Sequence, residues 1–268
     1  MTDSKRETIR SKIWREVAEP DNPFAAAECF CGGYDVYGDV LGQASWIEYL
    51  YLLFKAERPA AWQAKLLEGL AVAVANPGPR DQSVHAAMSG GVGGSTHASC
   101  LMAALAVGAG QFGGAHEVAN CIDYWHTCEY DIEKWQARIQ NPVHDERADI
   151  WLRIEHPPGF DPHGASCTTP VRQTLAYLAK CSEGRALSWL ADHREELELA
   201  ADCPLWMPGV AAAAFVDLEF SADQAEMLYL LLRLPGAAVH ALEQQHYGYK
   251  RFPFFHNAIH LVNDPGPR

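Results

Sequence analysis

The chain has 268 residues, of which 49% are hydrophobic and 21% are charged. This length suits one large domain or a large domain with a smaller lobe. The formal net charge of −13 argues against a nucleic-acid-binding protein, which would present a basic face. The N-terminus is polar and no uninterrupted run of about 20 apolar residues occurs, so we expect neither a signal peptide nor a membrane span.

The eight cysteines are scattered along the chain and form no disulfide framework. Cys29 and Cys31 make a C-x-C pair, and no second pair lies at zinc-finger spacing. The twelve histidines contain no recognised ligand motif such as H-E-x-x-H. We therefore expect reduced thiols that pack as small hydrophobic side chains, a cytoplasmic location and no bound metal.

Apolar residues recur at helical spacing along most of the chain, and strand signals are scarce. The first expected helix covers 41–57, with Ser45 as its N-cap and Pro59 as its stop signal. Pro208 suits the first turn of a later helix, and Ser221 begins a capping box. The other expected helices cover 60–75, 96–108, 115–139, 142–154, 170–181, 183–201, a segment beginning at 206, 221–234 and 237–245. The sequence therefore predicts an all-α chain of about ten helices.

Turn signals separate these helices. Asn76-Pro77-Gly78-Pro79 is a strong turn, and the glycines of 110–114 interrupt the helical pattern. The proline-rich segment 156–164 is expected to be a long irregular loop. Pro235-Gly236 is expected to end one helix before the next begins.

The stretch 76–120 joins a helix of small residues to Phe112-Gly113-Gly114-Ala115. Five further segments contain motifs that can be compared with those of known families. They are CGGYDVYGDVLGQASWIEYLYLLFKAERP (31–59), PPGFDPHGASCTTPVR (157–172), WMPGVAAAAFVDL (206–218), LLLRLPGAAVHALEQ (230–244) and YKRFPFF (249–255). In order and spacing these segments resemble the citrate synthase superfamily over about residues 30 to 265. The resemblance is closest to the citryl-CoA lyase module of ATP-citrate lyase.

The resemblance implies an all-α, citrate-synthase-like fold with two lobes. A large lobe would comprise 1–117 plus 206–268, and a small lobe 118–205 would close over the cleft. The family uses a coenzyme A thioester as substrate, and it condenses an acyl-CoA with a 2-oxo acid or cleaves the condensed product. It also implies a homodimer with helix 96–108 at the interface and the C-terminal tail crossing to the partner.

Such chemistry needs a base for the thioester α-carbon, hydrogen-bond donors for the carbonyl oxygens, and arginines whose planar fork matches a carboxylate. Matching of the motifs assigns these roles residue by residue. The candidate catalytic residues are His163, His85 and Asp161, and the candidate substrate-binding residues are Arg172, Arg233, Arg251 and His116.

The chain also departs from the family pattern. Family histidines fall on Pro77 and Pro162, and the family's catalytic aspartate falls on Pro208. A histidine of citrate synthases falls on Phe112, where the citryl-CoA lyase module also has Phe. A one-residue insertion would place His163 at the histidine position that falls on Pro162. Because proline cannot transfer a proton, the usual base is missing. The protein is therefore either an enzyme with a non-standard active site, or a catalytically inactive homologue that binds a CoA ester or organic acid or pairs with an active homologous subunit.

Ordinary structural roles stay open for several of these residues. His85 could simply cap a helix, and His163 could be a surface residue of its loop. Arg233 lies in an otherwise apolar helix, where an unpaired charge would be costly to bury, so it is expected to bind an anion or an acidic side chain. Asp217 and Glu219 could replace the missing carboxylate, although a surface role is the simpler expectation.

Overall fold

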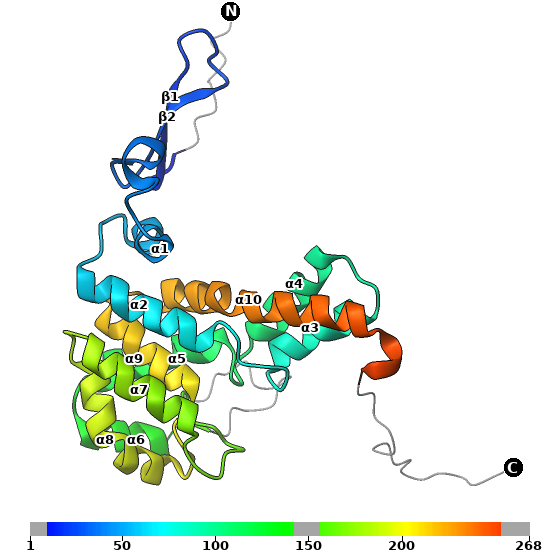
Figure 1. The fold of residues 1–268 in the computed structure, drawn as a ribbon. Coiled ribbons are helices and arrows are strands. Elements are labelled where there is room, and N and C mark those ends of the chain that lie inside the picture. The colour runs from blue at the N-terminus through cyan, green and yellow to red at the C-terminus, as the bar shows by residue number, and fades with distance from the viewer. Residues whose placement is uncertain (1–9, 142–155, 253–268) are drawn as a thin grey trace, which may run out of the picture.

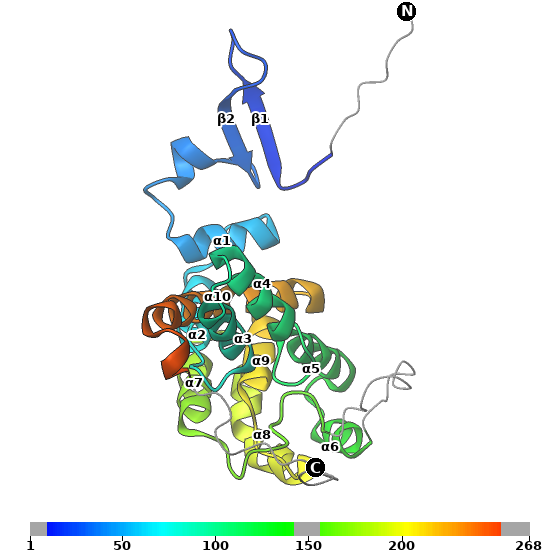
Figure 2. The same ribbon diagram turned by 90° about the vertical axis from the view of Figure 1, so that its right-hand side faces the viewer.

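The computed structural model describes residues 10–141 and 156–252. Within them, most of the chain is helical, as the sequence predicts (Figures 1 and 2). The helices are α1 Trp46–Lys55, α2 Ala61–Val74, α3 Gln82–Val92, α4 His97–Gly108, α5 Ala115–Cys128, α6 Ile132–Gln140, α7 Thr169–Cys181, α8 Ala186–Ala201, α9 Met207–Asp217 and α10 Ala222–Tyr247, with the short helical segments η1 Val36–Val40 and η3 Tyr249–Arg251.

A small antiparallel sheet, which the sequence did not lead us to expect, precedes the helices. It is formed by β1 Trp14–Ala18, β2 Ala26–Cys31 and β3 Tyr34–Asp35, in that order, with Trp14 opposite Cys31. Both views show the hairpin extending away from the helical body (Figures 1 and 2). Every residue of β1 is exposed, so the alternation that marks a half-buried strand is missing from its sequence.

The expected start signals are confirmed. Ser45 caps α1 and exchanges hydrogen bonds with Glu48, and Ser221 does the same with Gln224 at α10. Pro208 lies in the first turn of α9. Residues 156–164 form no helix or strand, as expected. These local signals work because each satisfies backbone groups that the first turn of a helix leaves without partners.

The structure differs from the helix predictions at three places, two of them between α2 and α6 and the third at Pro235. Helix α3 was not expected, although Asp81 supplies its N-cap by accepting hydrogen bonds from the amides of Ser83 and Val84. The single helix predicted over 115–139 is two helices, because Glu129 takes a positive φ of 50° between α5 and α6. The expected helix over 142–154 lies outside the described residues.

The third difference concerns Pro235, which was expected to end a helix but lies inside α10. The amide of the next residue, Gly236, donates to the carbonyl oxygen of Ala75 at 2.7 Å. A Cβ on Gly236 would lie 2.6 Å from that same oxygen, so only glycine allows this close approach. The loop after α2 thus packs on α10 at the point where proline interrupts its hydrogen bonds.

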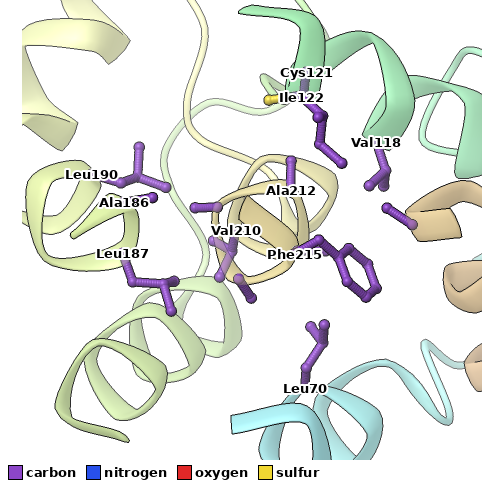
Figure 3. Close-up of a cluster of buried hydrophobic side chains, with 14 of the residues drawn as sticks. Leu70, Val118, Cys121, Ile122, Ala186, Leu187, Leu190, Val210, Ala212 and Phe215 are labelled. Carbon is purple, nitrogen blue, oxygen red and sulfur yellow. The ribbon is translucent and has the colours of Figure 1, made fainter. Parts of the chain in front are cut away.

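Helix α9 lies at the centre of the main core (Figure 3). Its residues from Pro208 to Phe215 are all buried, which is why the helix is apolar on every side. Side chains of α2, α5 and α8 surround it, among them Leu70, Ile122 and Leu187. Because α9 carries mostly small side chains, the neighbouring helices can approach it closely and fill the space with large apolar side chains.

A second cluster of buried side chains joins α3, α4 and the C-terminal half of α10. Its members are Val84, Ala87, Met88, Cys100, Ala104, Ala237, Ala241 and Phe252. A Cβ on Gly91 would collide with the carbonyl group of Ala241, so α3 and α10 are in backbone contact there. The division into lobes at 117/118 and 205/206 stays a prediction.

Helix α10 is long and apolar enough to cross a membrane, judged by length and composition alone. In this fold it packs against α3, α4 and α5 and contributes to both buried clusters. Core helices of folded domains pass the same test, and the burial of Leu228, Leu232 and Ala237 fits that role.

Candidate functional site

The turn between α4 and α5 depends on glycine. Gly113 has a φ of +73°, and a Cβ there would run into the ring of Trp206. A Cβ on Gly114 would collide with the carbonyl oxygen of Gly110. The Phe112-Gly113-Gly114 turn therefore brings the start of α5 against the segment that precedes α9.

A buried carboxylate fixes this turn to the loop 156–164. Glu117, which is 1% exposed, accepts hydrogen bonds from the backbone amides of Gly113 and Gly159. Its Oε1 also lies 3.3 Å from Nε2 of the buried His156, whose ring contacts Phe112 with centroids 5.8 Å apart. A buried charge needs such partners, because leaving it without them would cost far more than the hydrogen bonds contribute.

The same loop is also joined to the start of α9. The amide of Asp161 donates to the carbonyl oxygen of Pro204 at 2.8 Å, and the amide of Trp206 donates to that of Gly159 at 2.9 Å. Gly159 has a φ of +88°, and a Cβ on it would lie 2.9 Å from the Cα of Gly209. The three segments 112–117, 156–164 and 204–209 therefore meet at one place.

Arg233 connects α10 to the same place. Its Nη2 forms an ion pair with Oδ2 of Asp81, and its Nη1 donates to the carbonyl oxygen of Gly113 at 3.4 Å. The guanidinium carbon lies 5.0 Å from the ring centroid of Tyr229. The expectation that Arg233 binds an anion or an acidic side chain is met by Asp81, which lies 152 residues away in the sequence.

Other candidate residues lie around this centre. His85 is exposed, one turn beyond Asp81 on α3, and its ring stacks on Phe252 with centroids 5.5 Å apart. His116 is half exposed, and its Nδ1 lies 3.4 Å from Oε2 of Glu226 on α10. Their roles as ligand-contacting residues stay predictions.

The remaining candidates lie on the loop 156–164 and beyond. His163 is exposed, and its backbone amide donates to Oδ1 of Asp161 at 2.9 Å. Arg172 is exposed, donates to the hydroxyl of Thr169 at 3.1 Å, and lines an open cavity of about 520 Å³ next to α8. Arg233 lines a different, small cavity among α3, α4 and α10. Arg251 is exposed at the end of η3, which follows α10, with its guanidinium carbon 6.0 Å from the ring centroid of Tyr247.

Asp217 is not a surface residue. It is buried and caps α8, accepting hydrogen bonds from the amides of Ala186 at 2.6 Å and Leu187 at 3.1 Å and from the hydroxyl of Ser182 at 2.7 Å. Glu219 is exposed, and its carbonyl oxygen accepts from the ammonium group of Lys55. These contacts give Asp217 a structural role in place of the surface role that the sequence favoured.

The described residues contain no group of three His, Cys, Asp or Glu side chains close enough to hold a metal ion. Burial raises the pKa of the Tyr229 hydroxyl to about 12, although the charge of Arg233 lowers it. Burial also raises the pKa of the Cys121 thiol, with the nearby charge of Glu117 acting in the same direction. Both groups therefore stay protonated at neutral pH.

Sequence reasoning missed two residues of this centre, Asp81 and His156. It considered Glu117 as a residue that could face the cleft but favoured a solvated helix surface, which is wrong because Glu117 is buried. Asp81 carried a signal, since an aspartate two residues before a serine and a run of helix-compatible residues is a good N-cap. The pairing of Glu117 with His156 carried no signal, because it depends on the loop 156–164 folding back over α5.

No protein-family model matches the chain, and no curated protein matches it in sequence. Solved structures do match over nearly its whole length. The citryl-CoA lyase of Hydrogenobacter thermophilus aligns with a TM-score of 0.70 and 15% sequence identity, over 98% of this chain and 97% of that chain. This chain has the citryl-CoA lyase fold.

Two further structures agree. The ATP citrate lyase of Methanothrix soehngenii, in complex with citrate and coenzyme A, aligns with a TM-score of 0.72 and 19% identity. A mutant of the Methanosaeta concilii ATP citrate lyase, in complex with (3S)-citryl-CoA, aligns with a TM-score of 0.73 and 17% identity. Both alignments cover 97% of this chain and 42% of the other. The citrate-synthase-like fold expected from the sequence is confirmed.

Proposed function

We propose that this protein binds a coenzyme A thioester with an organic acid and makes or breaks a carbon–carbon bond between them. The full-length match to a citryl-CoA lyase supports this class of reaction. Further support comes from the ATP citrate lyase structures, which hold citrate with coenzyme A and (3S)-citryl-CoA.

One observation carries the enzyme proposal. By the motif resemblance, the family's catalytic aspartate falls on Pro208, which lies in the first turn of α9, and the amide of Asp161 donates to the carbonyl oxygen of Pro204 just before that turn. The backbone of Asp161 thus lies against Pro204, four residues before Pro208, and its carboxylate accepts a hydrogen bond from the amide of His163. We assign Asp161 as the base that replaces it.

In the condensing direction, Asp161 removes a proton from the α-carbon of the thioester. The resulting enolate carbon attacks the carbonyl carbon of the oxo acid, and the new alkoxide oxygen takes up a proton; cleavage reverses these steps. His163 and His85 would donate hydrogen bonds to the carbonyl oxygens. Arg172 and Arg251 would hold a carboxylate, with His116 at the edge of the site.

The second candidate function is a catalytically inactive homologue that binds such ligands or serves an active partner subunit. Two features favour it: Pro77, Pro162 and Pro208 stand where the family has side chains that transfer protons, and Arg233 is already paired within the chain. Fold alone does not decide between the two functions.

We also propose that the protein is a homodimer, with a heteromer as the alternative. Helix α4 leaves Met102 60% exposed and Val107 41% exposed, although almost all of its residues are small or apolar. Strand β1 at the edge of the small sheet is exposed along its whole length, so a covering surface would stabilise it. Light scattering on the purified chain checks this: a mass near twice 29.6 kDa supports the homodimer, and a monomer contradicts it.

The enzyme proposal is tested with acetyl-CoA and propionyl-CoA, each incubated with a panel of 2-oxo acids and analysed by mass spectrometry. We expect a condensed product from at least one pair, and its loss in Asp161→Asn. The matched control is Asp131→Asn, which changes an exposed N-cap aspartate of α6. Ligand-induced thermal stabilisation without any product would favour the second candidate.

A further inference from the structure

Arg233 already has partners within the chain. Its side chain is 7% exposed, Nη2 is paired with Asp81, Nη1 donates to the carbonyl oxygen of Gly113, and one face lies toward the ring of Tyr229. A planar guanidinium binds a carboxylate through this same edge. The resemblance assigned Arg233 to a carboxylate of the substrate, and that position is taken by a carboxylate of the protein.

Asp81 is held in this position by its own helix. Its Oδ1 accepts hydrogen bonds from the amides of Ser83 at 2.9 Å and Val84 at 3.3 Å, which leaves Oδ2 for Arg233. Moving Asp81 aside would therefore cost the N-cap of α3 as well as the ion pair. A second carboxylate brought beside Asp81 would meet a like charge, which acts against binding.

We propose that Asp81 sets the substrate class of this site. By occupying the edge of Arg233, it removes one carboxylate position, so that the site takes a monocarboxylic 2-oxo acid rather than a dicarboxylic one. This inference rests on the proposed function, because it concerns the organic acid that the same site would bind.

Arg172 is available to bind the single carboxylate of a monocarboxylic acid. Its side chain is exposed, and its Nη2 donates to the hydroxyl of Thr169 rather than to a carboxylate. Within the described part of the chain, Arg172 forms no ion pair, whereas Arg233 does. Arg251, the other arginine assigned to a substrate carboxylate, also forms no ion pair among the described residues, so one carboxylate can be held without Arg233.

Isothermal titration calorimetry in the presence of coenzyme A tests the inference with pyruvate, which has one carboxylate, and oxaloacetate, which has two. We expect the wild type to bind pyruvate more tightly. In Asp81→Asn, which keeps the N-cap oxygen but loses the charge, the affinity for oxaloacetate should rise about tenfold or more, because a freed arginine gains a charged partner. The affinity for pyruvate should change far less.

Two further proteins make the result specific. Adding Arg233→Gln to Asp81→Asn should remove the gain for oxaloacetate, and Asp131→Asn, an N-cap aspartate with no arginine partner, should show no gain. If Asp81→Asn does not fold, Asp81→Ser supplies the same cap without the charge. An equal gain for both acids, or no gain, would overturn the inference while leaving acid binding intact. Failure of every protein to bind either acid would overturn the proposed function with it.

Discussion

Glu117 should be among the residues whose loss most destabilises the fold. In Glu117→Ala, the buried amides of Gly113 and Gly159 lose their acceptor, and His156 loses its partner. An unsatisfied buried donor costs about 1 to 3 kcal/mol, so two amides give a loss of about 4 kcal/mol. This is a large part of a total stability of about 5 to 15 kcal/mol.

Urea unfolding followed by circular dichroism measures this loss. Glu117→Gln keeps one acceptor oxygen and should fall between the wild type and Glu117→Ala. The control is Glu226→Ala, which removes a carboxylate that is 27% exposed and lies 3.4 Å from His116. An exposed pair of this kind contributes about 1 kcal/mol or less. A Glu117→Ala protein within about 1 kcal/mol of the wild type would refute the reasoning.

Three other predictions use different measurements. Asp217→Ala should lower the free energy of unfolding by about 2 to 4 kcal/mol, because three donors at the start of α8 lose their acceptor, and a loss below about 0.5 kcal/mol would contradict the capping role. Burial raises the pKa of Tyr229 to about 12, so the contribution of its neutral hydroxyl to stability is complete below about pH 10 and should be lost as the pH rises from about 10 to 12. Over this range the free energy of unfolding of Tyr229→Phe should fall less than that of the wild type. Iodoacetamide at pH 8 should label the partly buried Cys181 faster than Cys121, whose pKa is raised by burial, and peptide mass spectrometry showing equal rates would contradict this.

Local signals in the sequence were enough to predict much of the helical fold. The caps at Ser45 and Ser221 and the proline at 208 act within one helical turn, so their effect can be read from neighbouring residues. Pro235 misled the prediction because its missing hydrogen bond is offset by a contact with the loop after α2, from a distant part of the chain.

The site was only partly predictable for the same reason. The motif resemblance led to Arg233, but its partner Asp81 is 152 residues away, and no local pattern joins the two. Glu117 and His156 are 39 residues apart and meet only when the loop 156–164 packs on α5 and α9. Burial of these charges follows from tertiary packing, which residue spacing does not show.

The central proposal, that the protein forms an enolate of a coenzyme A thioester, is tested most directly by deuterium uptake from D₂O into the α-carbon of acetyl-CoA and propionyl-CoA, with and without 2-oxo acids. The account predicts exchange above the rate without enzyme, lost in Asp161→Asn and reduced in His163→Ala. Absence of exchange with every pair, while the ligands still stabilise the protein against heat, would contradict it and leave a binding or partner-subunit role.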